Sequence, residues 1–333
     1  MLYYAGEACQ VVHAVQTKII SVITPKYIFR FTRLPIDKCL SGIVYYNQLG
    51  IEVSDMNKLS LERKAQIIKV LCEGNSIRST ARITDTAINT VIKLLREVGA
   101  ACMDYQDKTM RNLTCNKLQI DEIWSFCYSK ADHVPAEKQG QFGYGDVWTF
   151  TAIDADTKLV PAWLASRRDA ESASIFIADL KERLSNRVQI TTDGHKAYLE
   201  AMERAFGSEV DYAMLVKLYG AEPITEKRYS PSECLGAEKH IIQGNPDLKE
   251  VSTSYVERQN LTMRMSMRRF TRLTNGFSKK LENHIYALAL YFMHYNFART
   301  HKTLANPYPR TPAIAAGISD HIWSIEEIVK LVS

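Results

Sequence analysis

Long apolar runs and secretory features are absent from this sequence of 333 residues. Its most apolar segment, residues 287–293, is only seven residues long and is followed by His294. A membrane-spanning helix needs about 20 apolar residues. The start of the chain also lacks the basic segment, apolar block and small-residue cleavage site of a secretory signal. These absences predict a cytoplasmic protein with no membrane partner.

Paired cysteine motifs are absent as well. The cysteines are odd in number, seven in all, and no two are spaced as Cys-x-x-Cys. This usage argues against a disulfide framework and a zinc ribbon, and it favours the reduced thiols of a cytosol. The chain is 46% hydrophobic and 24% charged, a balance that excludes wholesale disorder because it provides a core to bury.

Charge is distributed unevenly along the chain. The formal net charge is +5, but it is +5 over residues 56–117, −8 over residues 118–257 and +8 over residues 258–302. An acidic block between two basic blocks is typical of a protein that binds a polyanion around a centre of metal-binding carboxylates. The alternative is the ordinary variation of charge along any chain.

Residues 1–55 show no sustained helical or strand period, and a clear pattern begins at Met56. We interpret Met56 as the natural start, with the first 55 residues as an uncertain extension translated from upstream sequence. The alternative is a small extra domain.

Residues 56–100 have the pattern of three short helices. Ser60 is a good N-cap, Gly74 ends the first helix, residues 77–83 form the second, and the third stops at Gly99. A tight turn before the last helix is typical of a helix-turn-helix. Four residues of the third helix lie off its apolar stripe and can bond base edges and phosphates: Asn89, Thr90, Lys93 and Arg96. The alternative is a plain helical bundle with a solvated polar face.

Residues 101–117 resemble a linker, and the period then changes to two. The pattern predicts strands over residues 118–126, 147–154, 158–165, 188–194 and 212–218, and helices over residues 172–184, 195–206, 253–271 and 280–297. Residues 219–252 are predicted to be loop. This order is that of an RNase H-like α/β fold, so we expect a catalytic domain over residues 118–300, preceded by the all-α helix-turn-helix domain and followed by a C-terminal tail, residues 301–333.

Three acids stand out in this predicted domain. Asp121 lies in an apolar strand, Asp193 ends the fourth strand, and Glu257 opens a helix. Burying a carboxylate in a strand is costly unless it is paired or binds a metal. Two hard cations held by carboxylates can cut and rejoin a phosphodiester. Each acid taken alone is more simply a capping or surface residue, so the constellation carries the prediction.

Glu122 competes with Asp121, although its side chain should point to the opposite face of the sheet. The sequence does not decide whether Glu122 contributes to the site. Beyond Glu257, Arg264 and Arg268 continue a basic helix stripe that can hold DNA phosphates. The alternative for this stripe is a solvated basic face.

Four segments together resemble the DDE-type bacterial transposases of the insertion-sequence-one family, from about Met56 to the C-terminus. They are Gln119-Ile-Asp-Glu-Ile-Trp-Ser, Thr192-Asp-Gly-His-Lys-Ala-Tyr, Tyr255-Val-Glu-Arg-Gln-Asn-Leu-Thr-Met-Arg and Tyr295-Asn-Phe-Ala-Arg-Thr-His-Lys-Thr-Leu. Residues 76–91 also resemble the DNA-binding region of that family. The chain departs from the family in two ways: it lacks the cysteine zinc ribbon that often precedes the helix-turn-helix, and it carries both functional parts in one reading frame.

The resemblance implies an RNase H-like core, a divalent metal, cleavage at transposon ends and strand transfer into target DNA. By matching position it makes Asp121, Asp193 and Glu257 the catalytic and metal-binding acids. It also places four further residues near the DNA or the metals: His195, Lys196, Arg258 and Asn260.

The expected protein is therefore a transposase with two Mg²⁺ ions, for which Mn²⁺ can substitute. Its expected partner is double-stranded DNA, as terminal inverted repeats and as target, in the nucleoid. Two DNA ends need two active sites, so we expect a homodimer or a larger assembly. The alternatives are an RNase H-like nuclease without strand transfer and an inactive DNA-binding regulator derived from a transposase.

Overall fold

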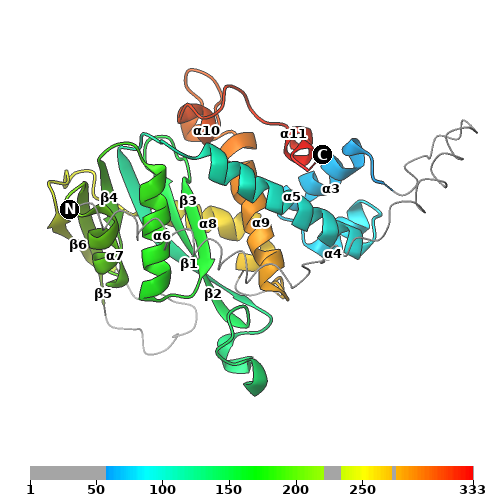
Figure 1. The fold of residues 1–333 in the computed structure, drawn as a ribbon, viewed down its shortest axis with the longest axis horizontal. Coiled ribbons are helices and arrows are strands. Elements are labelled where there is room, and N and C mark those ends of the chain that lie inside the picture. Colours follow the sequence, from blue (N-terminus) through cyan, green and yellow to red (C-terminus); the bar gives the residue numbers. More distant parts are fainter. Residues whose placement is uncertain (1–57, 221–233, 272–274, 333) are drawn as a thin grey trace, which may run out of the picture. The chain divides into compact units, whose positions relative to one another are not determined.

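The computed structural model describes residues 58–220, 234–271 and 275–332 (Figure 1). The expectations for residues 1–55 and for Met56 lie outside these ranges. From Ser60 onward the chain forms one unit, a mixed α/β sheet with helices packed against it. None of the helices in the described ranges has the length and apolar character needed to cross a bilayer.

A six-stranded sheet is the centre of this unit, with the strand order β3-β2-β1-β4-β5-β6. The strands are β1 (Lys117–Cys127), β2 (Gly145–Asp154), β3 (Ala162–Ser166), β4 (Val188–Thr192), β5 (Val210–Tyr219) and β6 (Cys234–Gln243). The first three form the predicted antiparallel meander, and β4 and β5 run parallel to β1. The carboxyl end of β4 therefore lies beside the middle of β1.

Helices cover both faces of the sheet. Phe150 of β2 contacts Phe176 of α6 (Ala170–Arg183) and Tyr198 of α7 (Ala197–Phe206) on one face. Trp163 of β3 stacks on Phe292 of α9 (Leu281–Met293) on the other face, where α8 (Ser254–Ser266) also contacts β1 and β2. The central strands of the sheet are therefore covered on both sides, which fits their apolar character.

Three helices are present in the region expected to bind DNA: α3 (Leu61–Cys72), α4 (Ile77–Ile83) and α5 (Ile88–Thr109). The prediction that the third helix stops at Gly99 and that a linker follows is wrong, because α5 continues to Thr109 and packs along α9. A Cβ on Gly99 would lie 2.5 Å from the Tyr286 Cβ. Gly99 thus permits close contact between two helices and does not end one.

The C-terminal segment, residues 301–333 in the prediction, packs against these helices. After a short helix α10 (Pro312–Ala315), helix α11 (Ile325–Lys330) contacts α3. The Trp323 ring contacts the rings of Tyr105 and Phe297, which also contact each other. Residues from both ends of the described chain therefore join one helical layer with α5 and α9.

Two further boundaries differ from the prediction. The segment predicted as loop contains β6, an exposed edge strand with no buried face to give it a period of two. Helix α8 ends at Ser266, and Arg268–Phe270 form a separate 3₁₀ turn. The end of α8 contacts the turn after α3, since a Cβ on Gly74 of that turn would lie 2.8 Å from the Ser266 carbonyl oxygen.

Candidate active site

Three carboxylates meet where β4 ends beside β1. The two strands pair as far as Ile120 and Thr192, so Asp121 and Asp193 are the next residue of each strand. Asp121, Glu122 and Asp193 each offer one oxygen that lies within 4.8 Å of the other two. The arrangement gathers three carboxyl groups where β4 ends, beside the central strand β1.

Asp121 is the most perturbed of these acids. Its Oδ2 accepts a hydrogen bond of 2.8 Å from the Asn260 amide, and its Oδ1 accepts one of 2.8 Å from the Glu122 backbone N–H. Burial raises the pKa of Asp121 to about 7, helped by the charges of Asp193, Glu122 and Glu257 and opposed by the backbone hydrogen bond. A cation at this position would therefore stabilise the ionised form of Asp121, which burial and, to a smaller extent, the neighbouring acids disfavour.

Glu122 lies on the face of the sheet opposite to Asp121, as the alternation of strand residues predicts. It accepts hydrogen bonds from the Tyr198 hydroxyl and, at 3.2 Å, from Arg168 Nε. Burial is the main cause that raises its pKa. Its carboxylate still reaches the other two acids, because β4 ends at Thr192 and leaves no strand between the two faces at this point.

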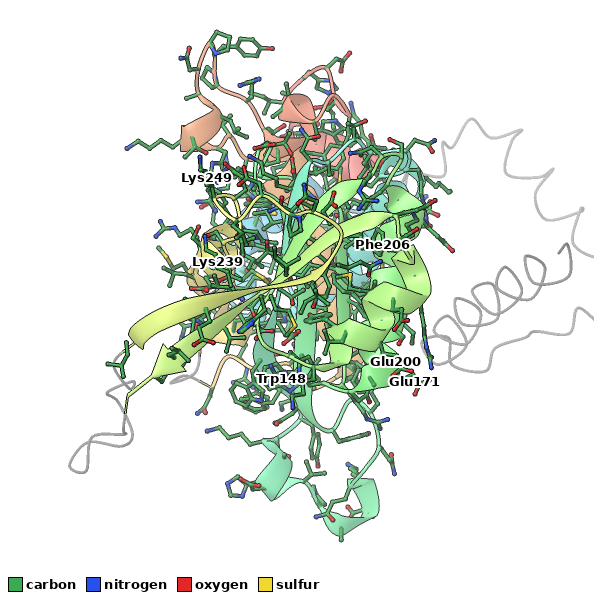
Figure 2. The ribbon with its side chains drawn as sticks, turned by 90° about the vertical axis from the view of Figure 1, so that its left-hand side faces the viewer. Trp148, Glu171, Glu200, Phe206, Lys239 and Lys249 are labelled. Atoms are coloured by element: carbon green, nitrogen blue, oxygen red, sulfur yellow. The ribbon has the colours of Figure 1, made fainter. Side chains whose placement is uncertain are left out.

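Asp193 is held by its own loop and faces an arginine. Its Oδ1 accepts the His195 backbone N–H at 3.0 Å, and Arg168 lies 4.0 Å from its Oδ2. The Arg168 guanidinium also lies 4.7 Å from the centre of the Trp148 ring, which is labelled in Figure 2. Arg168 thus faces both Glu122 and Asp193 at the rim of the acidic cluster.

Glu257 lies in the first turn of α8, outside the group of three oxygens that lie within 4.8 Å of one another. Its Oε1 accepts hydrogen bonds from Lys217 of β5 and from the Thr253 hydroxyl. Its charge nevertheless contributes to the raised pKa of Asp121. Of the three predicted acids, Asp121 and Asp193 are therefore adjacent, and Glu257 lies near enough for its charge to act on Asp121.

The residues predicted to contact DNA near these acids have different surroundings. The Asn260 side chain is buried against Asp121, whereas Arg258 is exposed on α8 and Lys196 is exposed at the start of α7. The His195 ring lies edge-on to Tyr198, 5.6 Å away.

The basic stripe predicted to follow Glu257 is shorter than expected. Arg264 lies in the last turn of α8, but Arg268 lies beyond the end of that helix in the 3₁₀ turn. Arg268 therefore does not continue the helical face that begins at Glu257.

The four polar residues predicted on the third helix fall into two groups. Asn89 and Lys93 are exposed on α5, and Thr90 is half-buried; Lys93 lies 3.8 Å from Glu97. Arg96 instead forms an ion pair with Glu282 of α9. Arg96 thus links two helices through an ion pair while its side chain stays partly exposed, and its contact with DNA stays a prediction.

Sequence reasoning missed three residues of the site: Arg168, Tyr198 and Lys217. Each contacts a carboxylate that belongs to an element distant in sequence, so no local sequence pattern predicts the contact. The pair Arg167-Arg168 directly after β3 was the only local signal, and a pair of arginines is common on surfaces.

The donor set suits a hard divalent cation. Carboxylate and amide oxygens are the ligands that Mg²⁺ and Mn²⁺ prefer, and the cluster supplies three carboxylates. Asn260 Oδ1 is a buried oxygen that has no hydrogen-bond partner among the described residues. The residues present therefore fit a divalent metal.

Comparison with known proteins agrees with this geometry. Residues 140–219 match the family model for IS240-type transposases, described as a DDE domain. The match runs from the loop before β2 to the end of β5 and includes Asp193. Residues 140–219 are therefore similar to the DDE domain of transposases, in agreement with the sequence motifs, although the match does not single out the insertion-sequence-one family.

Two solved structures are distantly similar. One is a Mos1 transposase paired-end complex with left transposon end, 12% identical, which covers 53% of this chain and 67% of that chain with a TM-score of 0.19. The other is a piggyBac transposase synaptic complex with hairpin DNA, 9% identical, which covers 86% of this chain and 74% of that chain with a TM-score of 0.33. No curated protein sequence matches the chain. The DDE assignment depends on the family match and not on these distant likenesses.

Proposed function

We propose that this protein binds the ends of an insertion sequence, cleaves them and joins them to target DNA. The observation that carries the proposal is the adjacency of Asp121 and Asp193 at the junction of β1 and β4. Asp193 lies in the segment that matches a DDE domain, residues 140–219. The strand order β3-β2-β1-β4-β5, with helices on both faces, supports an RNase H-like core.

Asp121, Asp193 and Glu257 would together hold two Mg²⁺ ions, with Mn²⁺ able to replace either. When bound, such ions activate the attacking oxygen of a water or a DNA 3′-hydroxyl and stabilise the leaving oxygen. Lys217 and Thr253 orient the Glu257 carboxylate through their hydrogen bonds to it. The exposed Arg258 is placed to bind a phosphate of the DNA strand beside this carboxylate.

Helices α4 and α5 would bind the terminal repeats as a helix-turn-helix. Asn89 and Lys93 are exposed on α5, and Arg78 and Arg82 are exposed on α4. An exposed amide at the start of a helix suits an adenine edge, and the basic side chains suit the phosphates on either side of the groove. The two ends of an element need two such sites, which supports a homodimer or a larger assembly.

A nicking and strand-transfer assay tests the proposal. It uses DNA ends from the encoding locus, with Mg²⁺ or with EDTA, and compares the wild type with Asp193→Asn. The matched control is Asp132→Asn, because Asp132 is an exposed acid in the β1–β2 connection. We expect cleavage and joined products in Mg²⁺ for the wild type and the control, and none for Asp193→Asn.

The same assay separates the two alternatives. Metal-dependent cleavage without joined products would indicate a nuclease. Tight binding of the ends by the wild type, without any cleavage in Mg²⁺ or Mn²⁺, would indicate a DNA-binding regulator. Normal cleavage by Asp193→Asn would overturn the assignment of the acids.

A further inference from the structure

Helix α8, which carries Glu257, has no side-chain cap of its own. Its N-cap residue, Thr253, makes no capping hydrogen bond, although the first backbone N–H groups of any helix lack partners within the helix. The missing acceptor comes from the sheet. Gln119 Oε1 accepts the backbone N–H of Tyr255 at 2.8 Å and that of Val256 at 3.1 Å. Gln119 is 3% exposed, so this is a buried bridge.

Gln119 stands two residues before Asp121 on β1, and residues two apart on a strand face the same side. A second bridge joins the same two elements, where the Asn260 amide donates to Asp121 Oδ2 at 2.8 Å. The two bridges engage α8 on either side of Glu257. Together they fix the start of the helix, and with it the Glu257 backbone, relative to the Asp121 carboxylate.

The contacts of Glu257 itself do something different. Lys217 and Thr253 hydrogen-bond to its carboxylate, so they select the direction of the side chain. Neither contact ties α8 to β1. Gln119 and Asn260 therefore supply the buried side-chain hydrogen bonds between α8 and β1, the strand that carries Asp121.

We propose that Gln119 is a positioning residue of the metal site, which acts with Asn260 by holding α8 at the distance from β1 that lets Glu257 and Asp121 share a cation. The inference rests on the proposed role of Glu257 as the third acid. Removing a group that orients a metal ligand without touching the metal typically lowers the affinity of the site for the metal about 10- to 100-fold.

The test measures Mn²⁺ binding to the full chain without DNA, from the electron paramagnetic resonance signal of free Mn²⁺. The variants are Gln119→Met, Glu257→Gln and the double variant, and thermal unfolding is recorded for each. Gln189→Met is the matched control. Gln189 is a glutamine of the neighbouring strand β4 whose side chain also bridges to backbone, at Asp247 N–H and C=O, but away from α8.

We expect Gln119→Met to weaken Mn²⁺ binding about tenfold. In the Glu257→Gln background the same change should alter the Mn²⁺ affinity by less than about twofold, because the bridge acts through Glu257. Gln119→Glu, which keeps an acceptor at the helix start, should recover most of the affinity. Gln189→Met should bind Mn²⁺ as the wild type does. If Gln119→Met does not fold, Gln119→Asn takes its place, since it shortens the reach by one methylene and remains polar.

An unchanged Mn²⁺ affinity in Gln119→Met would overturn the inference, and so would an equal loss in both backgrounds, which would show an effect independent of Glu257. A loss of thermal stability with unchanged Mn²⁺ affinity would mean that Gln119 is structural only. Failure of the proposed function is visible separately: Glu257→Gln alone would then bind Mn²⁺ as tightly as the wild type does.

Discussion

The Tyr198 hydroxyl of α7 donates a hydrogen bond to the Glu122 carboxylate of β1, and both side chains are buried. The contact joins the helix that follows Asp193 to the strand that carries Asp121. It also supplies one of the few donors available to a carboxylate inside the sheet. The acidic cluster is therefore supported from the α6–α7 face as well as from α8.

Tyr198→Phe should destabilise the fold by about 1–3 kcal/mol, because it leaves a buried carboxylate short of a donor while preserving the ring. Chemical unfolding at pH 7 measures this loss. Tyr308→Phe is the control, since Tyr308 is 57% exposed, and it should change stability by less than about 0.5 kcal/mol. Equal stability of Tyr198→Phe and the wild type would show that the Glu122 contact contributes nothing.

The stability of the metal-free protein should fall as the pH rises from about 4 to about 7. Asp121 has a pKa raised to about 7 from an ordinary value of 3.8, so the folded state holds a proton that the unfolded state releases. Folding therefore binds protons in this range, and the stability that the proton confers is lost as the pH passes through the folded pKa. Unfolding midpoints recorded in EDTA across the range measure the slope.

Asp121→Asn should flatten this slope and should be more stable than the metal-free wild type at pH 8, by about 1–3 kcal/mol, since a tenfold change in proton affinity is worth about 1.4 kcal/mol. Added Mn²⁺ should stabilise the wild type at pH 8 more than it stabilises the variant. A slope that persists unchanged in Asp121→Asn would assign it to other groups.

Much of the local structure and part of the site follow from the sequence. Ser60 caps α3 as predicted, with the Arg63 N–H donating to its hydroxyl at 3.2 Å, because a cap depends only on residues three apart. The adjacency of Asp121 and Asp193 follows from the strand order, which the alternation of strands and helices already indicates. Both features depend on patterns that are short or regular.

Other features depend on where elements end relative to one another. Glu122 reaches the acidic cluster because β4 stops at Thr192. The sequence pattern of β1 does not predict where the neighbouring strand ends. Arg96 has the chemistry of a DNA contact but lies opposite Glu282, which is 186 residues away. Strand β6 is exposed along nearly its whole length, so it lacks the buried face that makes a strand visible in a sequence.

Gly99→Ala should destabilise the protein by about 1–3 kcal/mol, because α5 and α9 would have to separate to admit the methyl group. The new Cβ would lie 2.5 Å from the Tyr286 Cβ and 2.6 Å from its carbonyl oxygen. Gly236→Ala is the control, since nothing lies within 4 Å of the position of its Cβ. Thermal unfolding compares the two variants, and an unchanged midpoint for Gly99→Ala would contradict the close packing of α5 on α9.

Binding to the terminal repeats should depend on Asn89 and Lys93 in different ways. Asn89→Ala should weaken binding to a terminal-repeat duplex about 5- to 150-fold with little effect on an unrelated duplex, because a lost base-edge contact is worth about 1–3 kcal/mol. Lys93→Ala should weaken binding to both duplexes alike and lower the slope of log affinity against log salt by about 1.

Arg96→Ala should act mainly on stability, since its partner is Glu282. Fluorescence anisotropy over a range of salt concentrations distinguishes the three variants. Loss of specific binding in Arg96→Ala, with Asn89→Ala unaffected, would place the DNA on another face of α5.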